Sequence, residues 1–468
     1  MKIIVVGCGK IGYTIAKVLS EKEGINVTVV DNDPNVFDNT AEPIDVKFIS
    51  GNGVNERTLI EAGAKDADLI VSTTNADELN VLCCIMAERL GTKHSIARVR
   101  NPEYMLEFNK LWKDLGIDMV INPERQTARE ISRILRYPVA DDIITFIGDR
   151  VEMVSFKVSE TPEYFVGKSV SQVFDSNMGI LLAIVERDNQ AFIPNGDFIF
   201  KESDIIRIMG RPSQIMKFLT LIKKRPKKTQ EVMVIGGGKI THYLVELLNR
   251  DTTKTNIKII EKDRSKCETL YEAFSSSSLE RRCLFIHGDG TNEELLIAEE
   301  IDKMDAIVCL TDRDEENVFI SLYALRKGVK KVITKVNYIH QNMVKNLGLD
   351  VGSIVTPQNI TAKTVIRYVD GLIGAGGNIK TIHQIFSGHD GNVEAIEFQV
   401  NKKAKCLDIP IKNLRLKKGI LIGCISRDYD VIIPSGETQI HIGDSVIIIS
   451  KNNDIRDIDD ILVNKIDF

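Results

Sequence analysis

Three glycines near the start of the chain have the spacing of a phosphate-holding turn. Gly7, Gly9 and Gly12 form a G-x-G-x-x-G run after the apolar stretch KIIVV, and Asp31 ends a second apolar stretch, VTVVD. In such a turn the glycines permit a sharp bend, close approach of the backbone to a pyrophosphate, and tight packing of the following helix. An acidic residue about 20 positions later accepts hydrogen bonds from ribose hydroxyls and repels a 2′-phosphate. The alternative is a mere strand-to-helix turn, but the run favours an NAD(H) site.

Further polar residues stand at the ends of later apolar stretches. Thr73 and Thr74 end LIVST, and Arg98 lies late in SIARVR. Because parallel sheets bind ligands at the carboxyl ends of their strands, we expect these side chains beside the glycine turn, where they suit phosphate or ribose. A surface ion pair for Arg98, and helix-capping polarity for the two threonines, are the structural alternatives.

The glycine turn occurs a second time, as VIGGGKIT from Val234 to Thr241. Gly236, Gly238 and Glu261 then take the places of Gly7, Gly9 and Asp31. Other positions differ: Thr241 replaces the third glycine, Leu310 and Thr311 replace the threonine pair, and Lys335 replaces Arg98. We therefore expect the second site to bind nucleotide more weakly or differently.

The duplication also tests for a catalyst. A dehydrogenase needs a positioned acid, base or nucleophile, most often His, Lys or Cys. No His or Cys recurs at equivalent positions of the two copies, whereas the nucleotide features mostly do. The eight cysteines contain no C-x-x-C pair, so we expect buried, reduced thiols and no structural zinc. The sequence therefore predicts no catalytic and no metal-ligating residues, and favours sensing over catalysis.

Repeated segments extend over most of the chain and predict its domains. KFISGNG returns as LFIHGDG, STTNADELNVL as CLTDRDEENVF, and the stretch from Gly179 to Gly210 returns from Gly419 to Ser450. We expect a duplicated two-domain unit. Its predicted parts are a nucleotide-binding domain at 1–137, a small domain at 138–222, a linker at 223–229, a second nucleotide-binding domain at 230–371 and a second small domain at 372–468. The basic run KKRPKK within the linker is either a solvated hinge or an anion-binding patch.

Within each copy, strands alternate with helices and then give way to a different pattern. KIIVVG, NVTVVD, VKFIS, ADLIVST and SIARVR are continuously apolar, which is typical of a parallel sheet covered on both faces. We expect two doubly wound, Rossmann-like α/β domains, each followed by a small α+β domain. A helix should run through INPERQTAREISRILRYP, with Ala128, Ile131, Ile134 and Leu135 on one face and a stop at Pro138.

Two helices show a start signal in the sequence. Asn75 with Glu78, and Asp312 with Glu315, are spaced to cap the helices after LIVST and its copy.

Composition narrows the function classes. The chain has 468 residues, 43% of them hydrophobic, and a formal net charge of −5. Nucleic-acid binding relies on Lys and Arg, so this acidic chain is a poor candidate for it. No apolar run approaches the roughly 18–20 residues of a spanning helix, and the first residues lack a signal-peptide layout. We expect a cytoplasmic protein that is not inserted in the membrane.

Taken together, VVGCGKIG, VVDND, SGNG, STTNADELN, IARVRNPEY and NPERQTAREI resemble the nucleotide-binding domain of potassium-channel regulators. The tail RDNQAFIPNGDFIFKESDIIRIMG resembles their small C-terminal domain, and two such units in tandem resemble the regulatory subunits of Trk-type potassium uptake systems. The resemblance implies a peripheral cytoplasmic subunit that binds NAD(H), with ATP or ADP as further ligands. It also implies a ring-like homo-oligomer on the inner face of the membrane, held there by an integral-membrane potassium transporter subunit that it gates.

Carried over by position, the resemblance implies a set of nucleotide-binding residues and a role for one helix. The residues are Gly7, Cys8, Gly9, Lys10, Ile11, Gly12, Asp31, Thr73, Thr74 and Arg98 in the first copy, and Gly236, Gly237, Gly238, Lys239, Ile240 and Glu261 in the second. The helix from Pro123 to Leu135 would cross between domains and pack a dimer, its alternative being an ordinary core helix. The rival functions are a soluble NAD-dependent oxidoreductase with a degenerate second half, and a small-molecule-binding regulator of another membrane or metabolic partner.

Overall fold

The computed structural model describes most of the chain, in two compact units. The described residues are 1–36, 44–101, 104, 111–136, 142–148, 150–188, 190–222, 229–250, 255–275, 282–337, 344, 348–373, 379–388, 391–400, 404–428, 430–451, 455 and 457–463. The basic run at 223–228 and the helix stop expected at Pro138 lie outside them. One unit combines residues 1–135 with 229–366, and the other combines 136–228 with 367–468.

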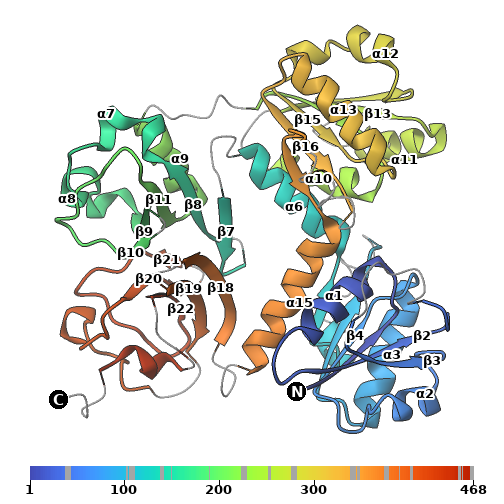
Figure 1. Ribbon diagram of the computed structural model, residues 1–468, viewed down its shortest axis with the longest axis horizontal. Helices are drawn as coiled ribbons and strands as arrows, with labels where there is room; N and C mark the ends of the chain where they lie inside the picture. Colours follow the sequence, from blue (N-terminus) through green and yellow to red (C-terminus); the bar gives the residue numbers. More distant parts are fainter. Residues whose placement is uncertain are drawn as a thin grey trace. The chain divides into compact units, whose positions relative to one another are not determined.

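The first unit contains two parallel sheets of identical topology (Figure 1). In the described residues each has six strands, in the orders β3-β2-β1-β4-β5-β6 and β14-β13-β12-β15-β16-β17. The strands of the first sheet are β1 Lys2–Val6, β2 Asn26–Asp31, β3 Lys47–Ser50, β4 Leu69–Ser72, β5 His94–Arg98 and β6 Met119–Ile121. Those of the second are β12 Glu231–Ile235, β13 Asn256–Glu261, β14 Cys283–His287, β15 Ala306–Cys309, β16 Lys331–Lys335 and β17 Ser353–Val355. The doubly wound α/β fold expected from the sequence is confirmed.

Helices cover these sheets. They are α1 Lys10–Ser20, α2 Glu56–Glu61, α3 Asp77–Leu90, α5 Leu111–Asp114 and α6 Pro123–Arg136 in the first copy, and α10 Lys239–Arg250, α11 Arg264–Ser275, α12 Glu293–Ala298, a short 3-10 helix Ile301–Lys303, α13 Asp314–Arg326 and α15 Pro357–Ile373 in the second. Of the α1 side chains at helical spacing, Ile11, Ile15 and Leu19 are buried, and Val18 is partly buried. The short strand β6 was not predicted, because three residues give no readable alternation.

The predicted starts of α3 and α13 are wrong. Ala76 and Arg313 occupy the N-cap positions, and neither helix has a side-chain cap. Glu78 instead accepts a 2.9 Å hydrogen bond from the Tyr104 hydroxyl. Asp312, which was expected to cap α13, has a side chain that is 91% exposed.

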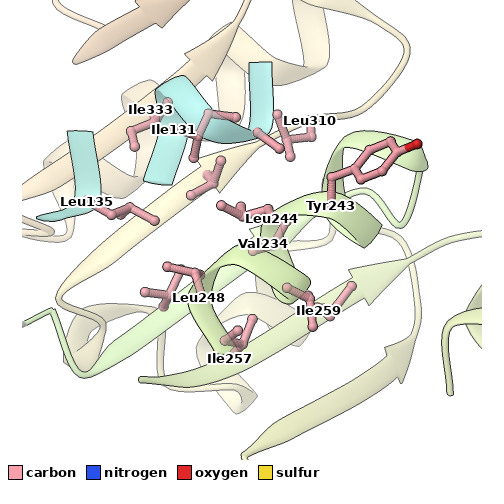
Figure 2. Packing of buried hydrophobic residues seen from close by; sticks show 14 of the residues in the cluster. Ile131, Leu135, Val234, Tyr243, Leu244, Leu248, Ile257, Ile259, Leu310 and Ile333 are labelled. Carbon is pink, nitrogen blue, oxygen red and sulfur yellow. The ribbon is translucent and has the colours of Figure 1, made fainter. Parts of the chain in front are cut away.

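Helix α6 belongs to the first copy in sequence but packs on the second sheet. Ala128, Ile131 and Leu135 are buried in one cluster with side chains of β12, α10, β13 and β15. Figure 2 shows Ile131 and Leu135 from α6 lying over Val234 and Leu244 of the second copy. Ile134 packs at the margin of the cluster, so the predicted apolar face is confirmed. Full burial of each large aliphatic side chain contributes about 1.5–3 kcal/mol, so α6 ties the two copies together as a crossover helix.

The second unit contains two antiparallel sheets (Figure 1). In the described residues each has five strands, in the orders β10-β9-β11-β8-β7 and β18-β19-β22-β20-β21. The first small domain contains β7 Asp142–Phe146, β8 Val151–Lys157, β9 Ile180–Arg187, β10 Gln190–Phe192, β11 Ile205–Gly210, α7 Pro162–Phe165, α8 Val170–Val173, α9 Pro212–Leu221 and short 3-10 helices Val158–Glu160 and Ser176–Met178. The second contains β18 Ile379–Gly388, β19 Gly391–Gln399, β20 Ile420–Arg427, β21 Asp430–Ile432, β22 Ser445–Lys451 and 3-10 helices Ile411–Asn413 and Ile458–Ile461.

The two small domains share a hydrophobic core, and each contains the same kind of buried aspartate–arginine ion pair. Met153 and Met209 from the first sheet are buried in the same cluster as Ile447 and Ile449 from the second. Each sheet also holds a buried aspartate in a two-point ion pair with an arginine: Asp204 with Arg187 at 2.6 and 2.8 Å, and Asp444 with Arg427 at 2.9 Å for both bonds. The two small domains therefore form a single intramolecular pair within this unit.

Candidate nucleotide site

Both glycine turns line one cavity of about 1330 Å³ in the first unit. The volume exceeds the roughly 300–1,000 Å³ typical of a site for one small ligand. The lining includes these sequence-predicted residues: Gly7, Gly9, Lys10, Ile11, Asp31, Thr73, Thr74, Arg98, Gly237, Gly238, Lys239 and Ile240. Cys8, Gly12, Gly236 and Glu261 are not among the lining residues. The first residues of the helices α6 and α15 also line the cavity, through Pro123, Glu124, Pro357 and Gln358.

The turn glycines have separate geometric roles. Gly7 and Gly236 have φ values of +85° and +104°, a region that side-chain-bearing residues rarely adopt. A Cβ on Gly9 or Gly238 would meet no protein atom within 4 Å, so the open space beside both glycines is available to a ligand. Gly9 is also the N-cap of α1 and offers no side-chain acceptor to the amides of the first turn. This arrangement fits a phosphate on the helix N-terminus.

Each turn is held by the acidic residue at the end of the second strand. Asp31 accepts hydrogen bonds from the amides of Cys8 at 2.6 Å and Asp33 at 2.9 Å. Glu261 does the same for Gly237 at 2.5 Å and Asp263 at 2.7 Å. The longer Glu261 therefore reproduces the contacts of Asp31. Because each carboxylate oxygen can accept two hydrogen bonds, the oxygens of Asp31 retain capacity for ribose hydroxyls at the cavity surface.

The second copy differs from the first at Thr241 and Leu310, and the two differences compensate for each other. Together they move one hydroxyl group from the end of a strand to the start of a helix. In the first copy the Thr73 hydroxyl donates to the carbonyl of Gly7 at 2.9 Å, and a Cβ on Gly12 would lie 2.7 Å from that hydroxyl and overlap the same carbonyl. In the second copy the Thr241 hydroxyl, on the helix, donates to the equivalent Gly236 carbonyl at 2.5 Å. Leu310 has taken the strand position of Thr73. The carbonyl thus keeps its hydroxyl partner, supplied from the other side.

Thr74 and its copy Thr311 are tied to a buried asparagine that the sequence analysis missed. Asn80 Oδ1 accepts from the Thr74 amide and hydroxyl, both at 2.7 Å, and Nδ2 donates to the carbonyls of Thr74 at 3.1 Å and Arg98 at 2.9 Å. Asn317 repeats all four bonds with Thr311 and Lys335. Both asparagines are fully buried. The sequence does contain a signal for this asparagine, because it recurs in both copies, in ADELN and in DEEN, three residues after an aspartate.

Aspartates one turn earlier recur in the same way. Asp77 accepts bonds from the amides of Arg100 and Asn101, both at 2.8 Å. Asp314 accepts a 2.8 Å bond from the amide of Asn337. The first turn of α3 therefore holds the main chain that follows β5, the strand that ends at Arg98. The first turn of α13 does the same after β16, which ends at Lys335.

The cations of the cavity are weakly paired. Arg98 lies 3.8 Å from Glu124, and its Nε and the Oε2 of Glu124 are buried with no hydrogen-bond partner in the described structure. Lys335 lies 3.9 Å from Asp312. Burial lowers the pKa of both Arg98 and Lys335, and for Lys335 the nearby charge of Lys10 lowers it further. Five cationic side chains and three carboxylates line the cavity, a balance that favours an anionic ligand.

The thiols offer no ready nucleophile. All eight cysteines are free, and each is buried except Cys283, which is partly buried. Burial raises the pKa of Cys8, beside the first turn, to about 12 and that of Cys283 to about 11. Since the thiolate is the reactive form, these groups are held in the inert state at neutral pH. Among the described residues, no group of three or more His, Cys, Asp and Glu side chains is placed to hold a metal ion.

Two family models match this chain, each of them twice. The model described as the TrkA-N domain matches residues 3–123 and 232–357, and the TrkA-C domain matches residues 153–223 and 395–463. The TrkA-N matches coincide with the two parallel sheets, and the TrkA-C matches lie in the two small domains.

Relatives match over nearly the whole length. A "Trk system potassium uptake protein TrkA homolog 2" from Methanosarcina mazei is 30% identical over 467 residues, covering 98% of this chain and 99% of the relative. A "Trk system potassium uptake protein TrkA" from Halomonas elongata is 29% identical over 470 residues, covering 98% of each.

Solved structures share the fold. The crystal structure of the GsuK RCK domain aligns with a TM-score of 0.59 at 18% identity, covering 96% of this chain and 92% of that one. The GsuK channel bound to NAD aligns with a TM-score of 0.60 at 19% identity, covering 96% and 77%. At these identities the likeness concerns the fold alone.

Proposed function

This chain belongs to the TrkA family of Trk system potassium uptake proteins, and from that premise we propose that it is a nucleotide-sensing regulatory subunit of a membrane potassium transporter. The ligand would be NAD(H), with ATP or ADP as further ligands. Nucleotide bound at the two glycine turns would prefer one arrangement of the unit and so bias the transporter. A tenfold preference between arrangements is worth about 1.4 kcal/mol, enough to shift a balanced equilibrium strongly.

The observation that carries this proposal is the arrangement of the two turns around one cavity. Each turn leaves open space beside its second glycine, and each is braced by a strand-end carboxylate. Arg98 and Lys335, partly buried and loosely paired, offer charge to phosphates. The chemistry of these residues fits a nucleotide: amides and cations for its phosphates, and the oxygens of Asp31 for its ribose.

Binding without turnover is part of the proposal. The thiols are held protonated by burial, so a covalent step on sulfur is disfavoured. His242 lines the cavity, but its place in the first copy is taken by Tyr13. No histidine or cysteine recurs in both copies to serve as a catalyst common to the two sites.

Association with the membrane would come from the partner. In the described residues no helix is long and apolar enough to cross a membrane. We place the chain at the cytoplasmic face, bound to the transporter subunit, in a ring-like homo-oligomer. The residues proposed for binding are those carried over by the resemblance, with Lys335 added from its burial in the cavity.

The test combines binding with transport. The purified full-length protein is titrated with NADH, NADPH, ADP and ATP, and rubidium flux is measured in vesicles that contain the purified transporter, with and without the protein. We expect nucleotide binding without NADH consumption, and flux that changes with nucleotide only when both proteins are present. Steady NADH oxidation that requires one defined substrate would refute the proposal, as would flux indifferent to the protein.

A further inference from the structure

Tyr243 belongs to the second copy but forms hydrogen bonds with residues of the first copy that lie near the first nucleotide site. It lies in α10, the helix that begins at the second glycine turn, and it is 3% exposed. Its ring packs in the core of the second sheet, and Figure 2 shows its hydroxyl pointing away from that cluster. The hydroxyl accepts a 3.0 Å hydrogen bond from Asn122 Nδ2 and donates one of 3.2 Å to the Arg100 carbonyl. Both partners belong to the first copy.

These partners hold elements that carry residues of the first site. Asn122 Oδ1 accepts a 2.8 Å bond from the Arg125 amide, so the same amide side chain caps α6, whose Glu124 lines the cavity. Arg98 is the last residue of β5, and Arg100 lies two residues further along the chain. One hydroxyl therefore joins the second glycine-turn helix to the supports of both Arg98 and Glu124.

Among the described residues, the equivalent place in the first copy has no such link. Thr14 stands there, and its hydroxyl donates to the Lys10 carbonyl of its own helix at 2.8 Å. Thr356 and Asn337 occupy the positions equivalent to Asn122 and Arg100. The shorter threonine side chain makes its described bond within α1, so the two sites are not tied in the same manner.

We propose that Tyr243 is a positioning residue for the first nucleotide site, through which occupancy of the second site changes the affinity of the first. This inference rests on the proposed function. Arg98 and Glu124 are separated by 3.8 Å, and each has a buried atom without a hydrogen bond to any described residue, so their positions depend on the main chain that carries them. A phosphate at the second turn fixes the start of α10, and the Tyr243 hydroxyl passes that constraint to β5 and α6. Burial raises the pKa of Tyr243 to about 12, so the hydroxyl keeps its proton for Arg100 at working pH.

The experiment uses Tyr243→Phe, which retains the ring and removes the hydroxyl. First-site affinity for NADH is measured by calorimetry in the parent and the variant, with the second site intact and with it weakened by Glu261→Ala. We expect Tyr243→Phe to change first-site affinity about fivefold or more when the second site is occupied, and to leave it unchanged in the Glu261→Ala background. Thr14→Val, which removes the equivalent hydroxyl of α1, is the matched control and should change neither value.

Asn122→Ser cuts the same link from the other side. Serine can still cap α6 but has no amide to donate to Tyr243. It should repeat the loss of coupling, and melting temperatures report folding of each variant. Equal first-site affinities for parent, Tyr243→Phe and Asn122→Ser, in a parent that binds two nucleotides, would overturn this inference alone. A folded parent that binds no nucleotide would overturn the proposed function itself.

Discussion

Thr73 and Thr241 donate hydrogen bonds to equivalent carbonyls, those of Gly7 and Gly236, from opposite sides of the turn. The first reaches the carbonyl from the end of a strand and the second from the start of a helix. The first turn requires its third glycine, because a Cβ on Gly12 would overlap the Gly7 carbonyl and crowd the Thr73 hydroxyl. In the second turn, too, the carbonyl of the first glycine has a hydroxyl partner.

Removing either hydroxyl should damage its own turn. Thr73→Val leaves the buried Gly7 carbonyl without this partner, which costs about 1–3 kcal/mol in the free energy of unfolding. Thr241→Val should cost a similar amount, and each variant should weaken nucleotide binding most at its own turn. Urea denaturation with a two-site nucleotide titration measures both effects.

The control for the threonine variants is Thr220→Val. That hydroxyl bonds within its own helix, to Met216, on an exposed surface. Its removal should change stability by less than about 0.5 kcal/mol. Equal effects of all three variants would contradict the assigned role of the two turn hydroxyls.

Asn80 is expected to matter for Arg98 without touching a ligand. Asn80→Leu removes a buried side chain that holds the Thr74 backbone and the Arg98 carbonyl. We expect a loss of about 2–4 kcal/mol in unfolding free energy, because several main-chain groups lose their partner together. First-site affinity should fall as well. Asn317→Leu should destabilise the chain as much but should weaken the first site less than Asn80→Leu does; the opposite pattern of affinities would refute this assignment.

Thiol reactivity should follow burial. With the pKa of Cys283 at about 11, its thiolate fraction at pH 8 is about 0.1%, against about a quarter for an ordinary thiol. The folded protein should react with an aromatic disulfide reagent at least about a hundredfold more slowly than the denatured chain, and the rate should rise about tenfold per pH unit between 8 and 10. A rapid, stoichiometric thiol at pH 7 would show a reactive cysteine that this account excludes.

Nucleotide affinity should depend on pH through Lys335. Its pKa is lowered in the free protein by burial and by Lys10, and a bound phosphate would raise it again. The contribution of Lys335 is therefore complete below its free pKa and is lost as pH rises through the higher pKa of the complex. Binding at alkaline pH should take up protons, seen as a calorimetric heat that depends on the buffer's ionisation enthalpy.

Lys335→Arg is the matched variant for this pH effect. Arginine keeps its charge across the range, as Arg98 does at the equivalent position of the first copy. The variant should bind at alkaline pH without proton uptake at this position. Proton uptake that is identical in parent and variant would assign the titration to another group.

The sequence predicted the elements with local signals and missed those that depend on distant partners. The strands before each glycine turn, the carboxylates Asp31 and Glu261, and the apolar face of α6 each have a short, readable pattern. The N-cap expected at Asn75 failed because the helix begins two residues later, at Asp77, whose carboxylate is directed to the amides after β5. No local sequence pattern indicates that the helix begins at Asp77.

The exchange of Thr73 for Thr241 could not be predicted from spacing. Its two positions are far apart in sequence within each copy and meet only when strand and helix pack. The link from Tyr243 to Asn122 joins residues from different copies, so comparing the copies shows only that Tyr243 replaces Thr14. Asn80 and Asn317 were within reach, because a buried polar residue that recurs in both copies is a readable signal.

The central claim, that each glycine turn binds a nucleotide, is tested most directly by calorimetric titration of NADH into the full-length protein. Its Asp31→Ala and Glu261→Ala variants are titrated alongside, with Asp31→Glu as control, since Glu261 makes the same bonds in the second copy. We expect two nucleotides per chain in the parent, as the central claim requires. Asp31→Ala should weaken the tighter phase about ten- to a hundredfold and reduce discrimination against NADPH, because a charge-assisted hydrogen bond is worth about 1.5–3 kcal/mol. Asp31→Glu should retain tight binding, and Glu261→Ala should affect the weaker phase. Failure of the parent to bind, or loss of the tight phase in Glu261→Ala but not in Asp31→Ala, would contradict it.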